Sequence, residues 1–236
     1  MATSQSQDNV LPNSQKPSDT WGEFNNISYL VQQAIGKIQT ATIVRIEKCT
    51  NNGGLTPVGY VDVTPMVSQI DAAGVTMPHT TIYNVPYFRI QGGANAIIID
   101  PEIGDLGICV FASRDITKVK NTKAQSAPGS FRQNSFSDGL YIGGVLNGLP
   151  AQYVQFSATG IRIHSPTKIK LDAPDILLSA TTIEINASAS VTMTTPIFQL
   201  NGEMNATGDI VGQGTSLHTH VHGGIAPGPS NTGQPV

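Results

Sequence analysis

The spacing of apolar residues changes twice along the chain. Residues 1–20 are polar, contain proline and offer almost nothing to bury, which is typical of a flexible tail. Apolar residues then recur every three or four positions, at Trp21, Phe24, Ile27, Leu30, Val31 and Ile35. This period predicts one amphipathic helix that ends near Gly36. Residues 1–37 are therefore expected to form a tail and a short helix.

From Ile38 onward the apolar period becomes two. Apolar segments separated by turn residues predict five strands, at 43–46, 58–63, 81–85, 96–99 and 104–111. Five short strands in so short a stretch favour a small barrel or sandwich, and a five-stranded OB-type barrel matches that size. We assign residues 38–120 to this domain. Residues 121–151 are mixed and polar, and we interpret them as a linker.

A third pattern, beginning at Gln152, repeats pairs of apolar residues separated by a single residue. The pairs are Val154/Phe156, Ile161/Ile163, Ile169/Leu171, Ile176/Leu178, Ile183/Ile185, Val191/Met193 and Phe198/Leu200. Their first members follow one another at steps of 7, 8, 7, 7, 8 and 7 residues. The residue inside a pair is polar in six of the seven cases, and turn-forming residues fill the intervals.

This repeat predicts a β-solenoid built by more than one chain. In a strand, both apolar members of a pair lie on the same face. A three-residue strand with two inward groups must stack on the next repeat to be stable. One chain would leave much of that face wet, whereas three intertwined chains would close a slender β-prism. Pro166, Pro174 and Pro196 exclude a helical coiled coil. We assign residues 152–212 to this stem.

The charge distribution argues against nucleic-acid binding. Charged residues make up only 12% of the chain and the net charge is −3, so no strong field attracts phosphate. The last basic residue is Lys170, which leaves the C-terminal part without a group to neutralise phosphates. Cys49 and Cys109 lack a CxxC spacing and are expected to be buried free thiols in strands, with a disulfide left open.

Three of the five histidines lie within five residues, at His218, His220 and His222. In an extended strand these side chains would share one face. Neighbouring imidazoles on that face could converge on one metal ion. Three chains meeting at the tip could offer six imidazoles, which suits an octahedral first-row ion such as iron(II) or nickel(II). We assign residues 213–236 to a metal-binding apex that caps the stem.

The repeat and its ending resemble a known family. The stem followed by His-Val-His-Gly-Gly-Ile-Ala-Pro-Gly, with Asn-Thr-Gly-Gln-Pro after it, is similar to the membrane-piercing central spike of contractile-tailed phages, the baseplate assembly V-type family. The segment from Gly104 to Ile116 and the motif Phe136-Ser-Asp-Gly resemble the end of that family's OB domain. The resemblance extends from about residue 38 onward.

The resemblance implies an all-β homotrimer. It would comprise an N-terminal OB-fold barrel, an intertwined trimeric β-helix or β-prism, and an apex where two histidines per chain hold one iron ion per trimer. The family's His-x-His before glycine matches His220 and His222, while His218 is an additional histidine of open role. The implied partners are the baseplate hub and tail tube, with transient contact to the host outer membrane. The implied location is the tail tip of a virion, from which the spike enters the cell envelope.

Two other functions are weaker interpretations. A metal-dependent hydrolase would need a general base near the histidines, and the nearest carboxylate in sequence is Asp209. No GxSxG, P-loop or GxGxxG motif is present, so we expect no enzyme activity. A trimeric β-helical tailspike or adhesin that binds cell-surface glycan is the main alternative. Such proteins use aromatic platforms, whereas after Phe156 the stem has one aromatic residue, Phe198.

Overall fold

The computed structural model describes residues 22–71, 73–221 and 228, and its fold is mostly β. Strands account for 28% and helices for 12% of the chain. By internal contacts the chain divides into two units, Met1–Lys170 and Leu171–Val236. Among the described residues, no helix is long and apolar enough to cross a membrane.

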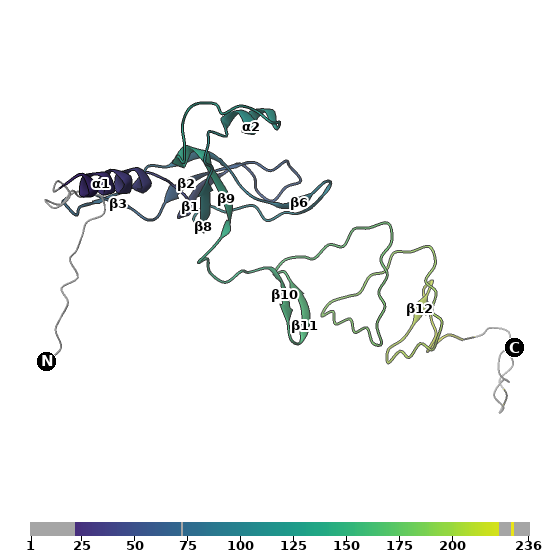
Figure 1. Ribbon diagram of the computed structural model, residues 1–236. Coiled ribbons are helices and arrows are strands. Elements are labelled where there is room, and N and C mark those ends of the chain that lie inside the picture. The colour runs from purple at the N-terminus through teal and green to yellow at the C-terminus, as the bar shows by residue number, and fades with distance from the viewer. Residues whose placement is uncertain (1–21, 72, 222–227, 229–236) are drawn as a thin grey trace, which may run out of the picture. The chain divides into compact units, whose positions relative to one another are not determined.

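The first unit contains most of the regular structure (Figure 1). Its helices are α1 (Glu23–Gly36), α2 (Thr117–Thr122) and the 3₁₀ turn η2 (Phe136–Asp138). Its longer strands are β1 (Ala41–Cys49), β2 (Tyr60–Pro65), β5 (Ile82–Pro86), β8 (Leu106–Phe111) and β9 (Gly139–Gly144). Three small hairpins are β3 (Gln69–Ile70) with β4 (Thr76–Met77), β6 (Ile90–Gly92) with β7 (Asn95–Ile97), and β10 (Tyr153–Ser157) with β11 (Gly160–His164).

The five longer strands form one curled sheet in the order β5-β2-β1-β8-β9, with every neighbouring pair antiparallel. The sheet curls until its two outer strands approach each other. Just beyond β5, Tyr87 makes a parallel bridge to Tyr141 of β9, and the Phe88 N–H donates to the Tyr141 carbonyl at 2.7 Å. Register shifts within three of the strand pairs increase this curl locally.

The sheet encloses a small apolar core. Burial alternates along β2 and β8, so one face of each strand points inward, as a period of two requires. The buried core residues are Val44, Ile46, Val61, Val63, Val85, Tyr87, Cys109, Phe111 and Tyr141. A Cβ at Gly107 would overlap the Tyr141 ring and the Gly143 carbonyl, so glycine allows β8 and β9 to meet here.

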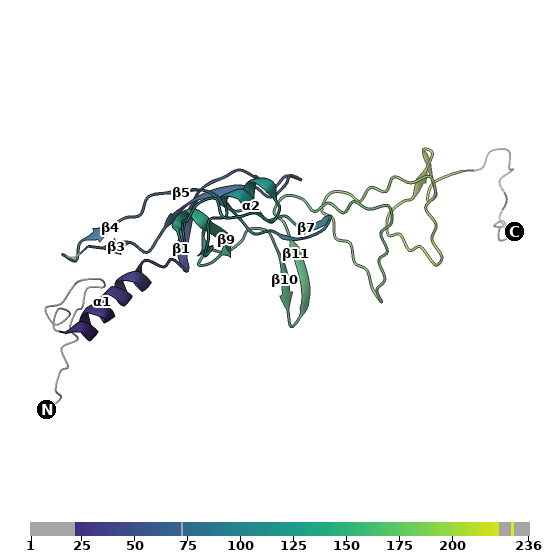
Figure 2. The ribbon, with the colours of Figure 1, turned by 45° about the horizontal axis from the view of Figure 1, so that its top comes forward.

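The predicted helix is confirmed as α1, and it buries none of its residues. Its apolar side chains remain half exposed or more, from Val31 at 50% to Phe24 at 82%. Figure 2 shows α1 standing clear of the sheet. An isolated helix of 14 residues is marginal in water, so this apolar face is a surface that packing against another molecule would stabilise.

Two assignments in the barrel region were wrong. Only the first half of the strand predicted at 96–99 is a strand, and it belongs to the β6–β7 hairpin and not to the five-stranded sheet. The fifth strand is instead β9, which lies inside residues 121–151, the range interpreted as a linker. Half of β9 is glycine, so its sequence resembles a loop. Its strand conformation depends on pairing with β8, which is far away in the sequence.

The stem repeat forms strands only at its first two pairs. These are β10 and β11, in which Val154 lies opposite Ile163 and Phe156 opposite Ile161. The remaining pairs, from Ile169 to Leu200, lie in chain without strands. In the second unit the described strands are β12 (Val211–Gly212) and β13 (Thr215–Ser216), which form a short hairpin. A three-residue strand needs a pairing partner, and one chain supplies none for these five repeats.

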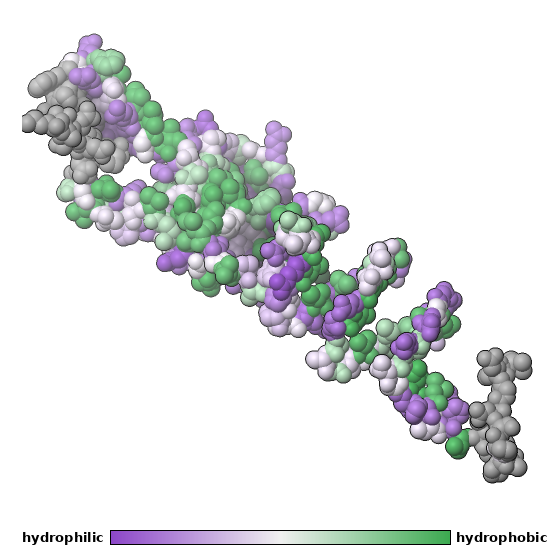
Figure 3. Space-filling view, turned by 90° about the horizontal axis from the view of Figure 1, so that it is seen from below, coloured by the Kyte–Doolittle hydropathy of each residue, from purple (hydrophilic) through white to green (hydrophobic). Residues whose placement is uncertain are grey.

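All fourteen apolar members of the repeat are between 50% and 75% exposed. Figure 3 shows hydrophobic residues at the surface of this part of the chain, between polar ones. Soluble proteins rarely leave so many large apolar side chains in water. The single chain therefore presents a regular series of apolar groups with nothing to bury them.

Candidate functional site

The candidate metal site begins directly after the β12–β13 hairpin. Residues 217–219 form a turn, whereas the sequence predicted an extended strand with three histidines on one face. That prediction was wrong for His218 and His220. His222 lies outside the described residues.

Hydrogen bonds from the preceding residues explain the turn. The His218 N–H donates to Asp209 Oδ1 at 3.1 Å, and the Thr219 N–H donates to Ser216 Oγ at 2.9 Å. The His220 N–H donates to the Ser216 carbonyl at 3.1 Å. Hydrogen bonds from the Ser216 side chain and from backbone N–H groups hold the pKa of Asp209 below its ordinary value. A carboxylate and a hydroxyl that accept consecutive N–H groups favour a turn over a strand.

The ring of His220 is oriented by the same turn. Its Nδ1 lies 3.1 Å from the Leu217 carbonyl oxygen. A carbonyl only accepts hydrogen bonds, so this contact places a hydrogen on Nδ1. Metal-binding histidines are commonly held in this way, with one ring nitrogen bonded to the backbone and the other facing the ion. The residues present therefore fit a metal ligand at His220.

The described residues do not by themselves form a complete metal site. Within this part of the chain, no cluster of three or more His, Cys, Asp or Glu side chains is placed to hold a metal ion.

Two clusters of buried charge in the barrel were not singled out by the sequence. In the first, Arg89 and Asp100 pair at 2.6 Å with side chains that are each 3% exposed. Tyr87 donates to the same Asp100 oxygen at 2.6 Å, and the Gly53 N–H donates to the other at 2.8 Å. Burial acts to raise the pKa of Asp100, but these hydrogen bonds outweigh it and lower the pKa.

The second cluster connects the segment after β8 to η2. Arg132 donates to both oxygens of Asp138, at 2.6 and 2.8 Å, and lies 3.1 Å from Asp115. Asp115 also accepts from Ser130 and from the Thr117 N–H. Hydrogen bonds from Thr117 and Ser130 hold the pKa of Asp115 well below its ordinary value. Carboxylates that are saturated by hydrogen bonds stabilise a loop and are poorly suited to proton transfer.

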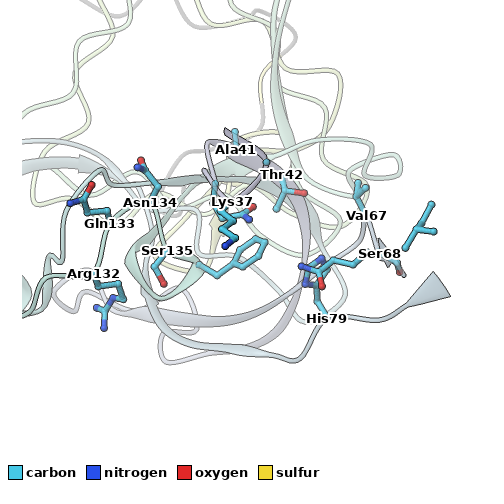
Figure 4. A pocket seen from close by; sticks show the side chains of 15 residues that line it. Lys37, Ala41, Thr42, Val67, Ser68, His79, Arg132, Gln133, Asn134 and Ser135 are labelled. Carbon is cyan, nitrogen blue, oxygen red and sulfur yellow. The ribbon is translucent and has the colours of Figure 1, made fainter. Parts of the chain in front are cut away.

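A pocket of about 840 Å³ lies between the end of α1, the start of β1 and the segment 132–136. Figure 4 shows Asn134 and Ser135 across this pocket from His79. The His79 ring packs edge-on against Phe136, with ring centroids 5.0 Å apart. The described lining contains neither a carboxylate nor a cysteine.

No protein-family model matches this sequence, and a search of curated proteins finds no significant match.

Proposed function

We propose that this protein is the central spike of a contractile injection machine, a homotrimer that pierces the outer membrane of its host when the sheath contracts. The observation that carries the proposal is the stem repeat, whose fourteen apolar members are all at least half exposed in the single chain. Three chains winding around one axis would turn these groups inward and pair the short strands between chains. A trimeric β-helix or β-prism is the architecture that this repeat suits.

The barrel supports the same proposal. In an OB fold the first strand lies in the middle of the sheet, between the second and the fourth, and the third strand closes on the fifth. Counting β1, β2, β5, β8 and β9 as first to fifth gives this order, with a parallel bridge at the closure. We propose that the barrel is an OB-type collar that docks on the baseplate hub and tail tube. The exposed apolar face of α1 suits part of that docking.

The apex would be held by one iron ion shared by the three chains. In this proposal His220 would supply Nε2, since its Nδ1 faces the Leu217 carbonyl, and His222 follows at the spacing of the resembled family. The backbone N–H of His218 is held by Asp209. The ion would supply bonds between chains at the end of the stem, where strands otherwise fray. The function needs stiffness and no catalysis. The scarcity of charge reduces the cost of passing through lipid.

Sedimentation equilibrium combined with elemental analysis of the purified full chain tests this proposal. We expect three times the chain mass and one iron per three chains. The double variant H220A/H222A should lose the metal and keep the trimer, since burial along the stem does not involve the apex. His164→Ala is the matched control, because His164 packs against Tyr153 in the stem and should leave the metal bound. A monomer, or one metal per chain, would contradict the shared apex.

A binding assay distinguishes the spike from an adhesin. A spike is driven through the membrane by the sheath, so the free trimer should not bind intact bacteria. An adhesin should bind them without any driving force, and that binding should be saturable and inhibited by surface glycan. Saturable binding of the free trimer would therefore overturn the piercing function.

A further inference from the structure

An exposed apolar surface lies on the barrel, apart from the stem. We name it the hairpin strip, and it consists of Phe88, Ile90, Ile97 and Ile99, which are 62%, 57%, 56% and 76% exposed. Ile90 of β6 pairs directly with Ile97 of β7. Phe88 lies two residues before Ile90, and Ile99 lies two residues after Ile97, on the same two arms of the hairpin. Because side chains alternate along a strand, these four residues share one face.

The opposite face of the hairpin is fixed by the first buried charge cluster. Arg89 and Asp100 belong to the two arms, and their ion pair joins these arms on the inner side. Arg89 also donates to the Thr56 carbonyl at 2.7 Å, which ties the hairpin to the loop between β1 and β2. A buried pair of this kind is costly to break, so the arms cannot rotate to bury the strip. The apolar face is thus held toward the outside.

The strip continues into β9, the strand that leads toward the stem. A groove of about 310 Å³ is lined by the strip, by Ile142 and Asn147, and also by charged residues that include Arg89, Asp100 and Asp105. Ile142 is itself 46% exposed. Contiguous exposed apolar patches on soluble proteins often mark interaction sites. These five apolar side chains are therefore a candidate contact surface.

The short segment between barrel and stem favours other copies of this chain as the molecules that cover the strip. Only residues 145–152 separate β9 from β10. Fully extended, they span about 30 Å, while a domain of this size has a radius of gyration of about 13 Å. Three barrels attached to one stem are therefore held side by side, at an effective concentration in the millimolar range. Under that condition a patch smaller than the roughly 800 Å² per partner of a free-standing interface is sufficient.

We propose that the hairpin strip faces the threefold axis and packs against the strips of the two other copies of this chain. The proposal rests on the trimer put forward under Proposed function. It adds a second apolar contact between chains, located in the barrels, which sets their orientation above the stem. The ion pair of Arg89 and Asp100 then holds the two arms of the hairpin so that the strip stays exposed to the other chains.

Cysteine cross-linking in the full-length protein tests this contact. The variants are Ile97→Cys and Ile99→Cys, both at exposed positions that tolerate a smaller side chain, with Leu55→Cys as the control. Leu55 is 95% exposed and lies in the loop between β1 and β2, outside the strip. Each variant is treated with a short bismaleimide, resolved on a denaturing gel, and compared with the natural chain, whose Cys49 and Cys109 set the background. Sedimentation of the untreated variant reports the number of chains independently.

The expected result is a covalent dimer band for Ile97→Cys or Ile99→Cys, at least fivefold stronger than for Leu55→Cys, in a protein that sediments as a trimer. A trimer in which neither strip cysteine cross-links above the control overturns the barrel contact and leaves the proposed spike intact. Strip cysteines that stay reactive in the trimer and are protected only by a hub protein also overturn it. A monomer overturns the contact and the spike together.

Discussion

Replacing one inward residue of the stem separates a shared apolar core from an ordinary exposed surface. Ile183 is 55% exposed in the single chain and lies at the first position of its pair. Burying a whole isoleucine contributes roughly 1.5–3 kcal/mol, so closing the remaining half contributes about 1.3 kcal/mol per chain. Three chains bury three such groups. The variant Ile183→Ala should therefore weaken the trimer by about 4 kcal/mol.

That loss corresponds to a roughly thousandfold decrease in the three-chain association constant, at about 1.4 kcal/mol per factor of ten. The matched control is Glu184→Ala, one residue further along, at the outward position of the same pair. Its carboxylate accepts only from Asn186 in an exposed hydrogen bond, so the expected effect is below about 0.5 kcal/mol. Sedimentation equilibrium at several protein concentrations, in guanidinium sufficient to dissociate part of the trimer, measures both.

Equal dissociation of the two variants would contradict this expectation. It would mean that the inward and outward positions of the repeat do not differ in burial. The alternation of apolar and polar residues would then have no structural role in the assembly. A smaller difference, of about 1 kcal/mol, would indicate a stem in which this repeat stays largely hydrated.

Three further predictions concern the barrel. Tyr87→Phe should destabilise it by about 1.5–3 kcal/mol in urea unfolding, because Asp100 loses a hydrogen bond to a buried charge; an unchanged midpoint would mean that water replaces the hydroxyl. Since the pKa of Asp115 is lower in the folded state, its stabilisation is complete above the unfolded pKa of about 3.9 and is lost as pH falls through the folded value. Acid titration followed by circular dichroism should thus show unfolding well below pH 4. Asp115→Asn should shift this unfolding to higher pH only if other carboxylates also lose stabilising interactions when they are protonated. Burial raises the pKa of the Cys109 thiol to about 12, so a thiol reagent should modify Cys49 in the native protein and Cys109 only after unfolding.

The spacing of apolar residues within a single segment was enough to predict several helices and strands. The three- and four-residue spacing from Phe24 to Ile35 predicted α1, and the alternating segments predicted β1, β2, β5 and β8. Both cysteines are free, as expected, but only Cys109 is fully buried and Cys49 is partly exposed. In each case the periodicity of side chains within one segment decides which face is apolar, and that information is local.

The conformation of the candidate site could not be predicted from the spacing of its histidines. The spacing of His218 and His220 suits a strand, but Asp209 and Ser216 accept the backbone N–H groups and stabilise a turn. The orientation of the His220 ring by the Leu217 carbonyl follows from that turn. Such hydrogen bonds depend on residues several positions away, brought close by the β12–β13 hairpin.

By itself, the sequence determined the mostly β character of the chain, its single N-terminal helix and the repeat of paired apolar residues. Tertiary structure alone decided that β9 joins the sheet, because a strand of which half is glycine is stabilised by pairing with β8 and by the close approach at Gly107. It also decided that Arg89 and Asp100 form a buried pair that turns the hairpin strip outward. The reason is the same in both cases. Strand pairing and burial depend on which segments, distant in sequence, come into contact in the fold. The spacing of apolar residues within one segment carries no information about that contact.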